Sequence, residues 1–386
     1  MISVDEALGH ILNLASPTDT EKVPLRQACG RVLAEPVVAT RNQPPFRASV
    51  MDGYAVAGDA DHYRVMGEAA AGHSYPGTLT QGECVRIFTG AVIPSGATRV
   101  VIQEDVHREN DRITLSDDAD SSRYIREIGA DFKVGDKVLA NARLTPSDVA
   151  LAASMNVPQV TVYRRPQVAF IATGDELVMP GEAPHDDQIM ASNNFGLAAL
   201  VEQEGAQARV LPIARDQASS LTASFELAAS ADLVVTIGGA SVGDHDIVGQ
   251  VAADLGMERA FYKIAMRPGK PLMAGKLGRI PLVGLPGNPV SSMVCGHIFL
   301  RPMVRAMQGL ARAALPRHQA ILSAPIGPNG PRQHFMRARL DGDFITAAER
   351  QDSSLLSVLS AANALLIRAP HDAARETGET VDFIHL

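Results

Sequence analysis

The chain has 386 residues, a length typical of two or three domains, and 46% of them are hydrophobic, which is enough for sizeable cores and excludes an intrinsically disordered protein. Asp and Glu outnumber Lys and Arg by 43 to 35, which gives a formal net charge of −8 at pH 7. Such a chain repels a phosphate backbone, and it has no Trp and few other aromatic residues to stack on bases, so we expect no nucleic-acid partner.

Cysteine usage and hydropathy indicate a soluble protein of a reducing compartment. The 3 cysteines (Cys29, Cys84 and Cys295) lie far apart in the sequence and include no Cys-x-x-Cys pair. No apolar run approaches the roughly 18 residues of a membrane span, and Asp5 and Glu6 near the start argue against a secretory signal. We therefore expect a cytoplasmic protein without a membrane contact.

The first part of the chain is expected to contain two helices with a β domain between them. Ser3 and Glu6 have the spacing of a capping box, and apolar residues follow at helical spacing, which predicts an N-terminal helix. Short Val- and Ile-rich runs then alternate with Gly, Pro and Asp clusters, which is typical of a small β domain. These runs cover residues 84–89, 99–103 and 112–115, and a second helix is expected at 145–157.

From residue 167 to about 308 the pattern repeats as strand, turn and helix. The predicted strands cover residues 167–173, 208–214, 233–238, 261–266 and 280–285, and the predicted helices 193–204, 216–230, 246–255 and 288–307. Nearly continuous apolar strands that alternate with helices predict a doubly wound parallel sheet covered on both faces. Residues 316–386 return to a β pattern, with a hairpin around 341–343 and a closing strand at 380–385.

Polar or glycine-rich loops follow all five strands of the predicted sheet. They cover residues 173–176, 215–216, 238–243, 267–270 and 286–289. Ligands of an open parallel sheet bind outside the carboxyl ends of its strands, so these loops are expected to form one binding site. A single loop of this kind is more often an ordinary turn, but five at one edge favour a site.

A group of cations is expected beside this edge. Lys263 and Arg267 alternate with Ala265, which predicts that both project to one side of the fourth strand, and a Pro-Gly turn then carries Lys270 past the same edge. Three cations in an acidic chain suit a phosphate or another oxyanion, and the 238–243 loop offers free backbone N–H groups for the same anion. The alternative is that these are surface charges at the end of an edge strand.

Acidic residues accompany the cations. They are Asp175, Glu176, Asp216, Asp244 and Asp246. Carboxylates beside a phosphate site commonly hold Mg²⁺, which uses one or two of them together with phosphate oxygens and water. The alternative is that Asp216 or Asp246 only caps the helix that follows it.

One competing motif predicts different chemistry. Residues 239–243 match Gly-x-Ser-x-Gly, the nucleophile elbow of serine hydrolases, with Ser241 as the nucleophile. The elbow needs a helix that begins directly after the serine, whereas Gly243 and Asp244 interrupt that start. The chain also has no HGGG-type oxyanion motif, so this reading is disfavoured.

Taken in order, the motifs resemble those of the molybdopterin molybdenumtransferase family (MoeA-type, related to the gephyrin E domain). The matching strings are PPFRASVMDGYAV (44–56), RIFTGAVIP (86–94), ATGDEL (172–177), IGGASVGDHD (237–246), KIAMRPGKP (263–271), GLPGNPVS (284–291) and, more loosely, QDSSLLSVLSAANAL (351–365). The resemblance spans nearly the whole chain. Residues 167–308 alone are also similar to molybdopterin adenylyltransferases.

The resemblance implies a multidomain α/β plus β fold and a homodimer whose sites are shared between subunits. The central doubly wound parallel α/β domain, of the molybdopterin-binding type, covers residues 167–310; an N-terminal helical domain covers 1–43 plus 137–166, an inserted β domain 44–136 and a C-terminal β domain 315–386.

The implied reaction inserts molybdenum from molybdate into adenylyl-molybdopterin in a Mg²⁺-dependent step that releases AMP. Protein partners implied by the resemblance are the molybdopterin adenylyltransferase and molybdoenzyme-maturation proteins. A molybdopterin adenylyltransferase and a non-catalytic scaffold remain as alternatives.

Family roles carry over to individual positions of this sequence. The catalytic set is Asp52, Thr89, Asp131, Glu176, Asp216 and Asp246, with Glu176 and Asp246 as metal ligands; the substrate-binding set is Gly238, Gly239, Ser241, Gly243, Lys263, Arg267, Lys270, Pro286, Pro289 and Ser353. Three departures stand out. Arg47 and Ala48 replace a common Asp-Asn pair, Ala130 replaces a frequent Glu, and Arg267 replaces a frequent Lys, which changes a point charge into a planar fork.

Overall fold

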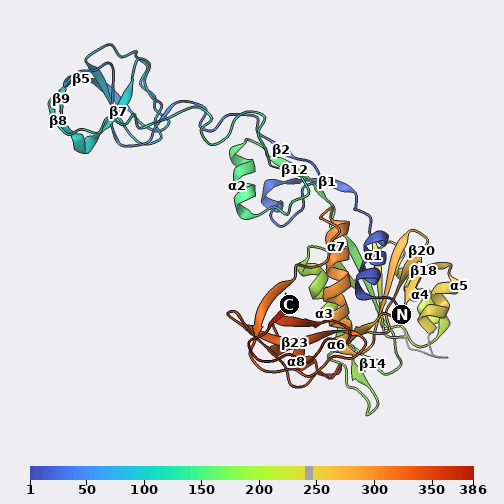
Figure 1. Ribbon diagram of the computed structural model, residues 1–386. Coiled ribbons are helices and arrows are strands. Elements are labelled where there is room, and N and C mark those ends of the chain that lie inside the picture. Colours follow the sequence, from blue (N-terminus) through green and yellow to red (C-terminus); the bar gives the residue numbers. More distant parts are fainter. Residues whose placement is uncertain (139, 240–246) are drawn as a thin grey trace. The chain divides into compact units, whose positions relative to one another are not determined.

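The computed structural model describes residues 1–138, 140–239 and 247–386 (Figure 1). The chain forms two compact units, one of residues 1–21, 30–34 and 162–386 and the other of residues 22–29 and 35–161. The finer division into four domains stays a prediction. No helix in the described part of the chain is long and apolar enough to cross a membrane.

The unit formed by residues 22–29 and 35–161 is built around a six-stranded sheet in the order β7-β4-β6-β5-β9-β8. Its strands are β4 (Gly53–Val56), β5 (His62–Ala69), β6 (Glu83–Ile87), β7 (Arg99–Ile102), β8 (Val106–Glu109) and β9 (Arg112–Leu115). The three predicted runs are thus confirmed as β6, β7 and β9. Both faces of the sheet carry an apolar core, because alternate residues such as Val85 and Cys84 point to opposite sides.

Short elements complete this unit. Two-residue strands pair as β2 (Val37–Val38) with β11 (Lys137–Val138) and as β3 (Ala48–Ser49) with β10 (Ile125–Arg126), and β1 (Thr20–Pro24) pairs with β12 (Gln159–Tyr163). The predicted helix is α2 (Pro146–Ser154), in which Thr145 and Asp148 form a capping box and Pro146 takes the first position.

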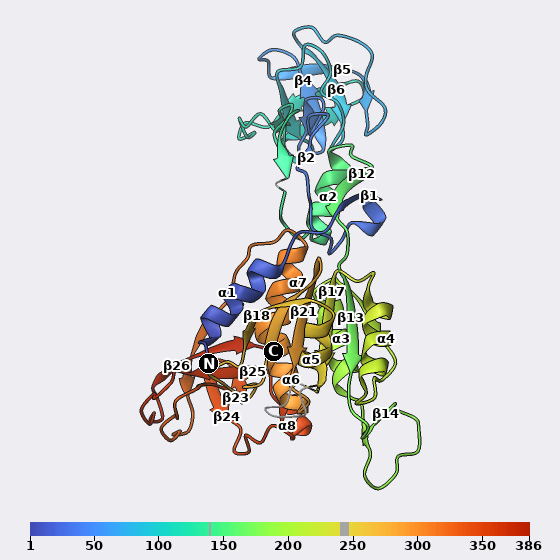
Figure 2. The ribbon, with the colours of Figure 1, turned by 90° about the vertical axis from the view of Figure 1, so that its right-hand side faces the viewer.

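The other unit holds the predicted α/β sheet, in the order β16-β13-β17-β21-β20-β18 (Figure 2). Its strands are β13 (Gln167–Ala172), β16 (Gln207–Val210), β17 (Leu233–Ile237), β18 (Met257–Tyr262), β20 (Met273–Leu277) and β21 (Ile280–Leu285). Its helices are α1 (Val4–Leu14), α3 (Asn193–Gln203), α4 (Ala218–Ala228), α5 (Ile247–Asp254), α6 (Pro289–Cys295) and α7 (Arg301–Met307), with a π-helical stretch, Gly296–Leu300, between α6 and α7.

Helices cover both faces of this sheet. Val168 and Phe170 of β13 pack in one core with α1, α3, α6 and α7, while Ala169 and Ile171 pack in a second core with α4 and α5. This alternation explains why the strand is a continuous apolar run in the sequence, and the doubly wound fold is confirmed. The predicted N-terminal helix is α1, with the expected capping box of Ser3 and Glu6.

The expectation of a fully parallel sheet is wrong at one strand. β20 runs antiparallel to both β21 and β18, and it joins β21 through a tight turn in which Gly278 has a φ of +60°. Its five residues, MAGKL, are too few to be told from a loop by periodicity. Because β18 is antiparallel to β20, it runs in the direction of β21, and its carboxyl end lies at the same edge as those of the other strands.

The expectation that Lys263 and Arg267 alternate along one strand is also wrong. β18 ends at Tyr262, and Lys263 follows with a φ of +66°. Arg267 belongs to β19 (Met266–Arg267), which leaves the α/β sheet and pairs with β23 of the C-terminal sheet, placing Arg267 opposite His334.

The C-terminal residues form a β structure that closes on itself. Its strands are β22 (His318–Leu322), β23 (Gln333–Asp341), β24 (Phe344–Ala347), β25 (Ala364–Arg368) and β26 (Thr380–His385), with α8 (Leu356–Ala361) before β25. An additional pairing of β23 with β25 closes the row β23-β24-β22-β26-β25 into a barrel. The predicted hairpin is β23 with β24, turning at Gly342, and the predicted closing strand is β26, so both are confirmed.

Candidate active site

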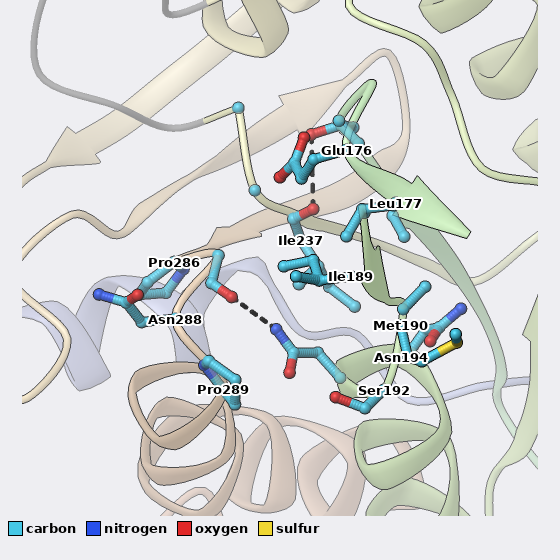
Figure 3. Close-up of a pocket in the computed structure, with 18 of the residues that line it drawn as sticks. Glu176, Leu177, Ile189, Met190, Ser192, Asn194, Ile237, Pro286, Asn288 and Pro289 are labelled. Atoms are coloured by element: carbon cyan, nitrogen blue, oxygen red, sulfur yellow. Dashed lines mark hydrogen bonds between the residues drawn. The ribbon is translucent and has the colours of Figure 1, made fainter. Parts of the chain in front are cut away.

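A cavity of about 490 Å³ lies at the carboxyl ends of β13, β17 and β21 (Figure 3). We call it the strand-edge pocket. Its lining includes predicted residues from four of the five loops, namely Thr173, Gly174, Glu176, Asp216, Gly238, Gly239, Pro286 and Pro289. Four of the five loops thus line one cavity, whereas the 267–270 loop does not line it and only Pro271, which follows that loop, does.

Two glycines give the strand-edge pocket its shape. Gly239 has a φ of +64°, and a Cβ there would lie 2.3 Å from Cγ2 of Val248 on α5. Gly174 has a φ of +147°, and a Cβ there would lie 2.3 Å from Oε2 of Glu176. The Glu176 carboxylate is thus folded directly over the backbone of Gly174, a position that only a residue without a side chain leaves open.

Two carboxylates, Glu176 and Asp216, line the strand-edge pocket. The alternative in which Asp216 caps the next helix is wrong, because α4 begins at Ala218 and its capping position is Gln217. Asp175 has a structural role, since its Oδ1 accepts a hydrogen bond from the backbone N–H of Asp216 at 3.2 Å. Ser241, Gly243, Asp244 and Asp246 lie outside the described residues, so the structure does not place these predicted residues.

The carboxylate pair fits Mg²⁺ that enters with a substrate. Among the described residues, no group of three or more His, Cys, Asp or Glu side chains is placed to hold a metal ion. Mg²⁺ keeps several water ligands and commonly takes one or two carboxylates together with substrate phosphate oxygens. Glu176 and Asp216 match that need, and a substrate phosphate would supply the remaining oxygens.

The other walls of the strand-edge pocket contain residues that the sequence did not single out. Nδ2 of Asn193, at the start of α3, donates to the carbonyl oxygen of Gly287 at 2.7 Å and so ties α3 to the loop before α6. Leu177, Ile189 and Met190 form an apolar wall, in which Ile189 is 59% exposed. This wall comes from the pairing of two short strands, β14 (Leu177–Val178) and β15 (Ile189–Met190), which have no periodic signal.

A second cavity, of about 340 Å³, is lined by cations, and we call it the oxyanion pocket. Its lining residues are Arg267, Pro268, Gly269, Lys270, Pro271, Ser291, Arg332, Gln351, Asp352 and Ser353. Three of them are cations and one is a carboxylate, so the lining has a formal charge of +2, opposite to that of the whole chain. Pro271 lines both cavities, which are therefore neighbours.

The oxyanion pocket unites Arg267, Lys270 and Ser353, as the resemblance implies, but does not include Lys263. Nζ of Lys263 instead lies over the ring of Tyr262, 4.9 Å from its centroid. The structure adds Arg332 and Ser291, which no motif marked. These residues come from loops and strands far apart in the sequence.

Hydrogen bonds from β23 hold the Ser353 loop in place. The side-chain amide of Gln351 pairs with the backbone N–H and carbonyl of Arg337, and Nη2 of Arg337 donates to the carbonyl of Asp352 at 3.1 Å. The loop is joined to α6 by a bond from the N–H of Val290 to the carbonyl of Ser353. Arg337 is fully buried, and its Nε and Nη1 have no hydrogen-bond partner within the described residues. It therefore adds positive charge behind the loop.

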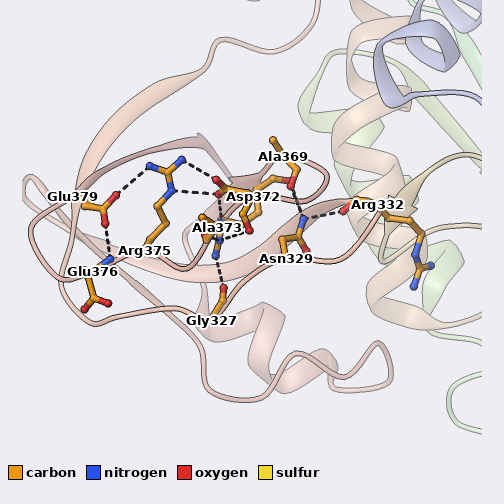
Figure 4. Close-up of polar contacts among 10 residues, drawn as sticks. Gly327, Asn329, Arg332, Ala369, Asp372, Ala373, Arg375, Glu376 and Glu379 are labelled. Carbon is orange, nitrogen blue, oxygen red and sulfur yellow. Dashed lines mark hydrogen bonds and ion pairs between the residues drawn. The ribbon is translucent and has the colours of Figure 1, made fainter.

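Arg332 is positioned by a separate network at the ends of the barrel strands (Figure 4). Nδ2 of Asn329 donates to the carbonyls of Arg332, at 2.9 Å, and Ala369, at 2.6 Å. Asp372 accepts hydrogen bonds from both Arg368 and Arg375, which fixes the segment after Ala369. The guanidinium of Arg332 reaches the carbonyl of Met266 at 3.4 Å, beside Arg267.

Asp52 and Thr89 lie together in the other unit. Asp52 directly precedes β4 and Thr89 follows the end of β6, where these antiparallel strands pair Gly53 with Ile87. Both the backbone N–H and Oγ1 of Thr89 donate to Oδ1 of Asp52 at 2.7 Å. These bonds lower the pKa of the Asp52 carboxyl, with the backbone bond as the larger cause. Arg47, which reverses a charge expected near Asp52, has an ion pair with Glu127 at 3.6 Å.

Asp131 lies in a different cavity of the same unit, of about 350 Å³. The other lining residues are Gln43, Pro44, Arg126 and Ala130. The backbone N–H of Asp131 donates to the carbonyl of Gln43 at 2.9 Å. Neither Asp52 nor Thr89 lines this cavity, so the structure does not join Asp131 to that pair.

The fold and these cavities define a class of protein: a multidomain α/β protein with a carboxylate-lined cavity at its strand edge and a cation-lined cavity beside it. Three family models match the chain, described as MoeA N-terminal region (domain I and II) at residues 2–156, probable molybdopterin binding domain at 169–306 and MoeA C-terminal region (domain IV) at 319–386.

The chain is 36% identical to a molybdopterin molybdenumtransferase of Nostoc sp., over 100% of this chain and 94% of the relative. It is 35% identical to one of Haemophilus influenzae, over 99% of this chain and 98% of the relative. A crystal structure of the molybdopterin biosynthesis MoeA protein of Pyrococcus horikoshii matches with a TM-score of 0.86 and 28% identity, covering 100% of this chain and 99% of that one. The chain belongs to the MoeA family of molybdopterin molybdenumtransferases.

Proposed function

We propose that the protein is a molybdopterin molybdenumtransferase, which inserts molybdenum from molybdate into adenylyl-molybdopterin and releases AMP. The observation that carries this proposal is the adjacency of two cavities of different chemistry, the strand-edge pocket with two carboxylates and the oxyanion pocket with a lining charge of +2, joined at Pro271. Full-length relatives named for this activity support it.

The strand-edge pocket would take the adenylylated substrate. Gly238 and Gly239, which follow β17 and line the pocket, have no side chain to keep a phosphate away from the backbone. The apolar wall of Leu177, Ile189 and Met190 suits a flat ring system. Glu176 and Asp216, together with Asp246, would hold Mg²⁺ against the phosphate oxygens. Bound there, Mg²⁺ would neutralise charge on the phosphate as AMP leaves.

The oxyanion pocket would take molybdate. A tetrahedral dianion matches the +2 charge of its lining, and Ser291 and Ser353 add hydroxyl donors. Because the two cavities adjoin, molybdate and the dithiolene of the substrate would be held next to each other, which converts an encounter in solution into a reaction within one complex. No protein nucleophile is required.

The proposal also includes finer features that the resemblance implies. They are a cytoplasmic homodimer whose sites are shared between subunits, a role for Asp52, Thr89 and Asp131 in the partner's site, and contacts with the molybdopterin adenylyltransferase and molybdoenzyme-maturation proteins. Two hydrogen bonds from Thr89 hold the Asp52 carboxylate in place and lower its pKa, as an ionised substrate contact would need.

The direct test incubates the purified protein with adenylyl-molybdopterin, sodium molybdate and MgCl₂ and measures AMP by chromatography. We expect AMP release that needs both molybdate and Mg²⁺ and falls sharply in Glu176→Gln, which keeps the side-chain size but removes the charge. Release of AMP without molybdate, or none from the folded wild-type protein, would overturn the proposal.

A further inference from the structure

Arg215 lies between the two loops that carry the carboxylates of the strand-edge pocket. It follows Ala214, which forms a bridge with Thr173, and it directly precedes Asp216. Its Nη1 donates to the carbonyl oxygens of Asp175, at 3.0 Å, and Leu177, at 3.3 Å. These two residues flank Glu176, so one guanidinium spans the backbone on both sides of that carboxylate.

Further bonds connect the same two loops. The N–H of Asp216 donates to Oδ1 of Asp175 at 3.2 Å, and the N–H of Gly174 donates to the carbonyl of Ala214 at 3.2 Å. Arg215 is itself fixed, because its backbone N–H donates to Oγ of Ser220 on α4 at 3.0 Å. Each loop therefore accepts hydrogen bonds from the other, and the Arg215 guanidinium is the group that holds the loop carrying Glu176.

We infer that Arg215 is a positioning residue of the strand-edge pocket: it holds Glu176 and Asp216 at a fixed separation, so that both carboxylates serve one Mg²⁺–phosphate group of the bound nucleotide. The inference rests on the proposed function of this pocket. Arg215 does not line the cavity, which argues against a direct contact with substrate. Without the guanidinium, two carbonyls lose their donor, and the segment that carries Glu176 is released.

Arg209 offers a matched control. It precedes Arg215 by six positions, on β16 of the same domain, and its guanidinium also makes two hydrogen bonds, to Oγ of Ser230 at 2.9 Å and to the carbonyl of Leu227 at 3.1 Å. Within the described part of the chain, the Arg209 side chain makes no hydrogen bond to the carboxylate loops and does not line the pocket. Arg209→Met and Arg215→Met thus remove the same charge and a similar number of bonds.

Two measurements test the inference. Calorimetric titration with AMP in the presence of MgCl₂ should show about tenfold or greater weakening in Arg215→Met, the usual cost of removing a group that orients a ligand, and no change in Arg209→Met. In the AMP-release assay, the Mg²⁺ concentration for half-maximal rate should rise similarly, while the KM for molybdate stays the same. Arg215→Lys, which keeps the charge and one donor nitrogen, should recover part of the loss.

Hydrogen exchange separates this inference from the proposed function. The amide N–H groups of Asp216 and Ile189, which bond to Asp175 Oδ1 and the Glu176 carbonyl, should exchange faster in Arg215→Met than in Arg209→Met. Equal exchange in both variants, or unchanged Mg²⁺-dependent AMP binding, overturns the positioning role. The positioning role would also be overturned if Arg215→Met changed the KM for molybdate but left the Mg²⁺ concentration for half-maximal rate unchanged. Failure of the wild type to release AMP refutes the proposed function but leaves the exchange comparison valid.

Discussion

Replacing Lys270 by Ala tests the oxyanion pocket most directly. Lys270 and Arg267 are exposed, so their charges act through water, where two unit charges about 4 Å apart interact by about 1 kcal/mol. A bound dianion therefore loses about 2 kcal/mol when one of these cations is removed. Since each 1.4 kcal/mol is a factor of about ten, the Kd for molybdate should rise about thirtyfold.

Salt dependence gives a second signature of the same cation. Molybdate binding is measured by calorimetry at about 0.05 M and about 1 M NaCl, between which the Debye length falls from over 10 Å to about 3 Å. The difference between wild type and Lys270→Ala should be large at low salt and mostly lost at high salt.

Lys276→Ala serves as the control, because Lys276 lies near the far end of β20 and does not line the pocket. Unchanged affinity of Lys270→Ala at low salt, or an equal loss in Lys276→Ala, would refute a local oxyanion site.

Three further predictions follow from the structure. In Gly174→Ala the new Cβ would lie 2.3 Å from Oε2 of Glu176, so calorimetry should show at least about tenfold weaker Mg²⁺-dependent AMP binding; normal binding would contradict the placement of that carboxylate. Burial lowers the pKa of His334 to about 4. Between pH 6.5 and 4 this histidine therefore binds a proton in the unfolded chain but not in the folded protein. Burial also lowers the pKa of His297 to about 4, so both proteins should lose unfolding free energy between pH 7 and 5. In urea titrations that loss should be about 2 kcal/mol smaller in His334→Gln than in wild type, and an equal loss in both proteins would count against this. Finally, Asp52→Ala and Glu176→Ala, each inactive alone, should regain about a quarter of wild-type activity when refolded together if sites are shared across a twofold dimer, whereas no recovery in proven mixed dimers would exclude sharing.

Local patterns in the sequence predict the α/β sheet well, because the burial of each central strand is visible in that strand's own residues. β13, β17 and β21 are buried on both faces, so each is a continuous apolar run with a polar loop at its carboxyl end. The strand-edge pocket follows from this, since parallel strands bring their carboxyl ends to one edge. Glu176 and Asp216 could be assigned for the same reason. β20 escaped prediction because its burial depends on strands on either side and not on its own short sequence.

The oxyanion pocket has no such local origin, and its residues show why. Arg332 reaches it only because β19 leaves the α/β sheet and pairs with β23 of the C-terminal sheet. In this pairing Met266 lies opposite Gln333, which comes 67 positions later in the chain. Nothing around Arg332 marks that pairing, and β19 is only two residues long. Family motifs led to Arg267, Lys270 and Ser353, whereas the pairing itself adds Arg332. An Arg332→Ala variant that binds molybdate as tightly as wild type would show that this long-range pairing builds the barrel without completing the anion site.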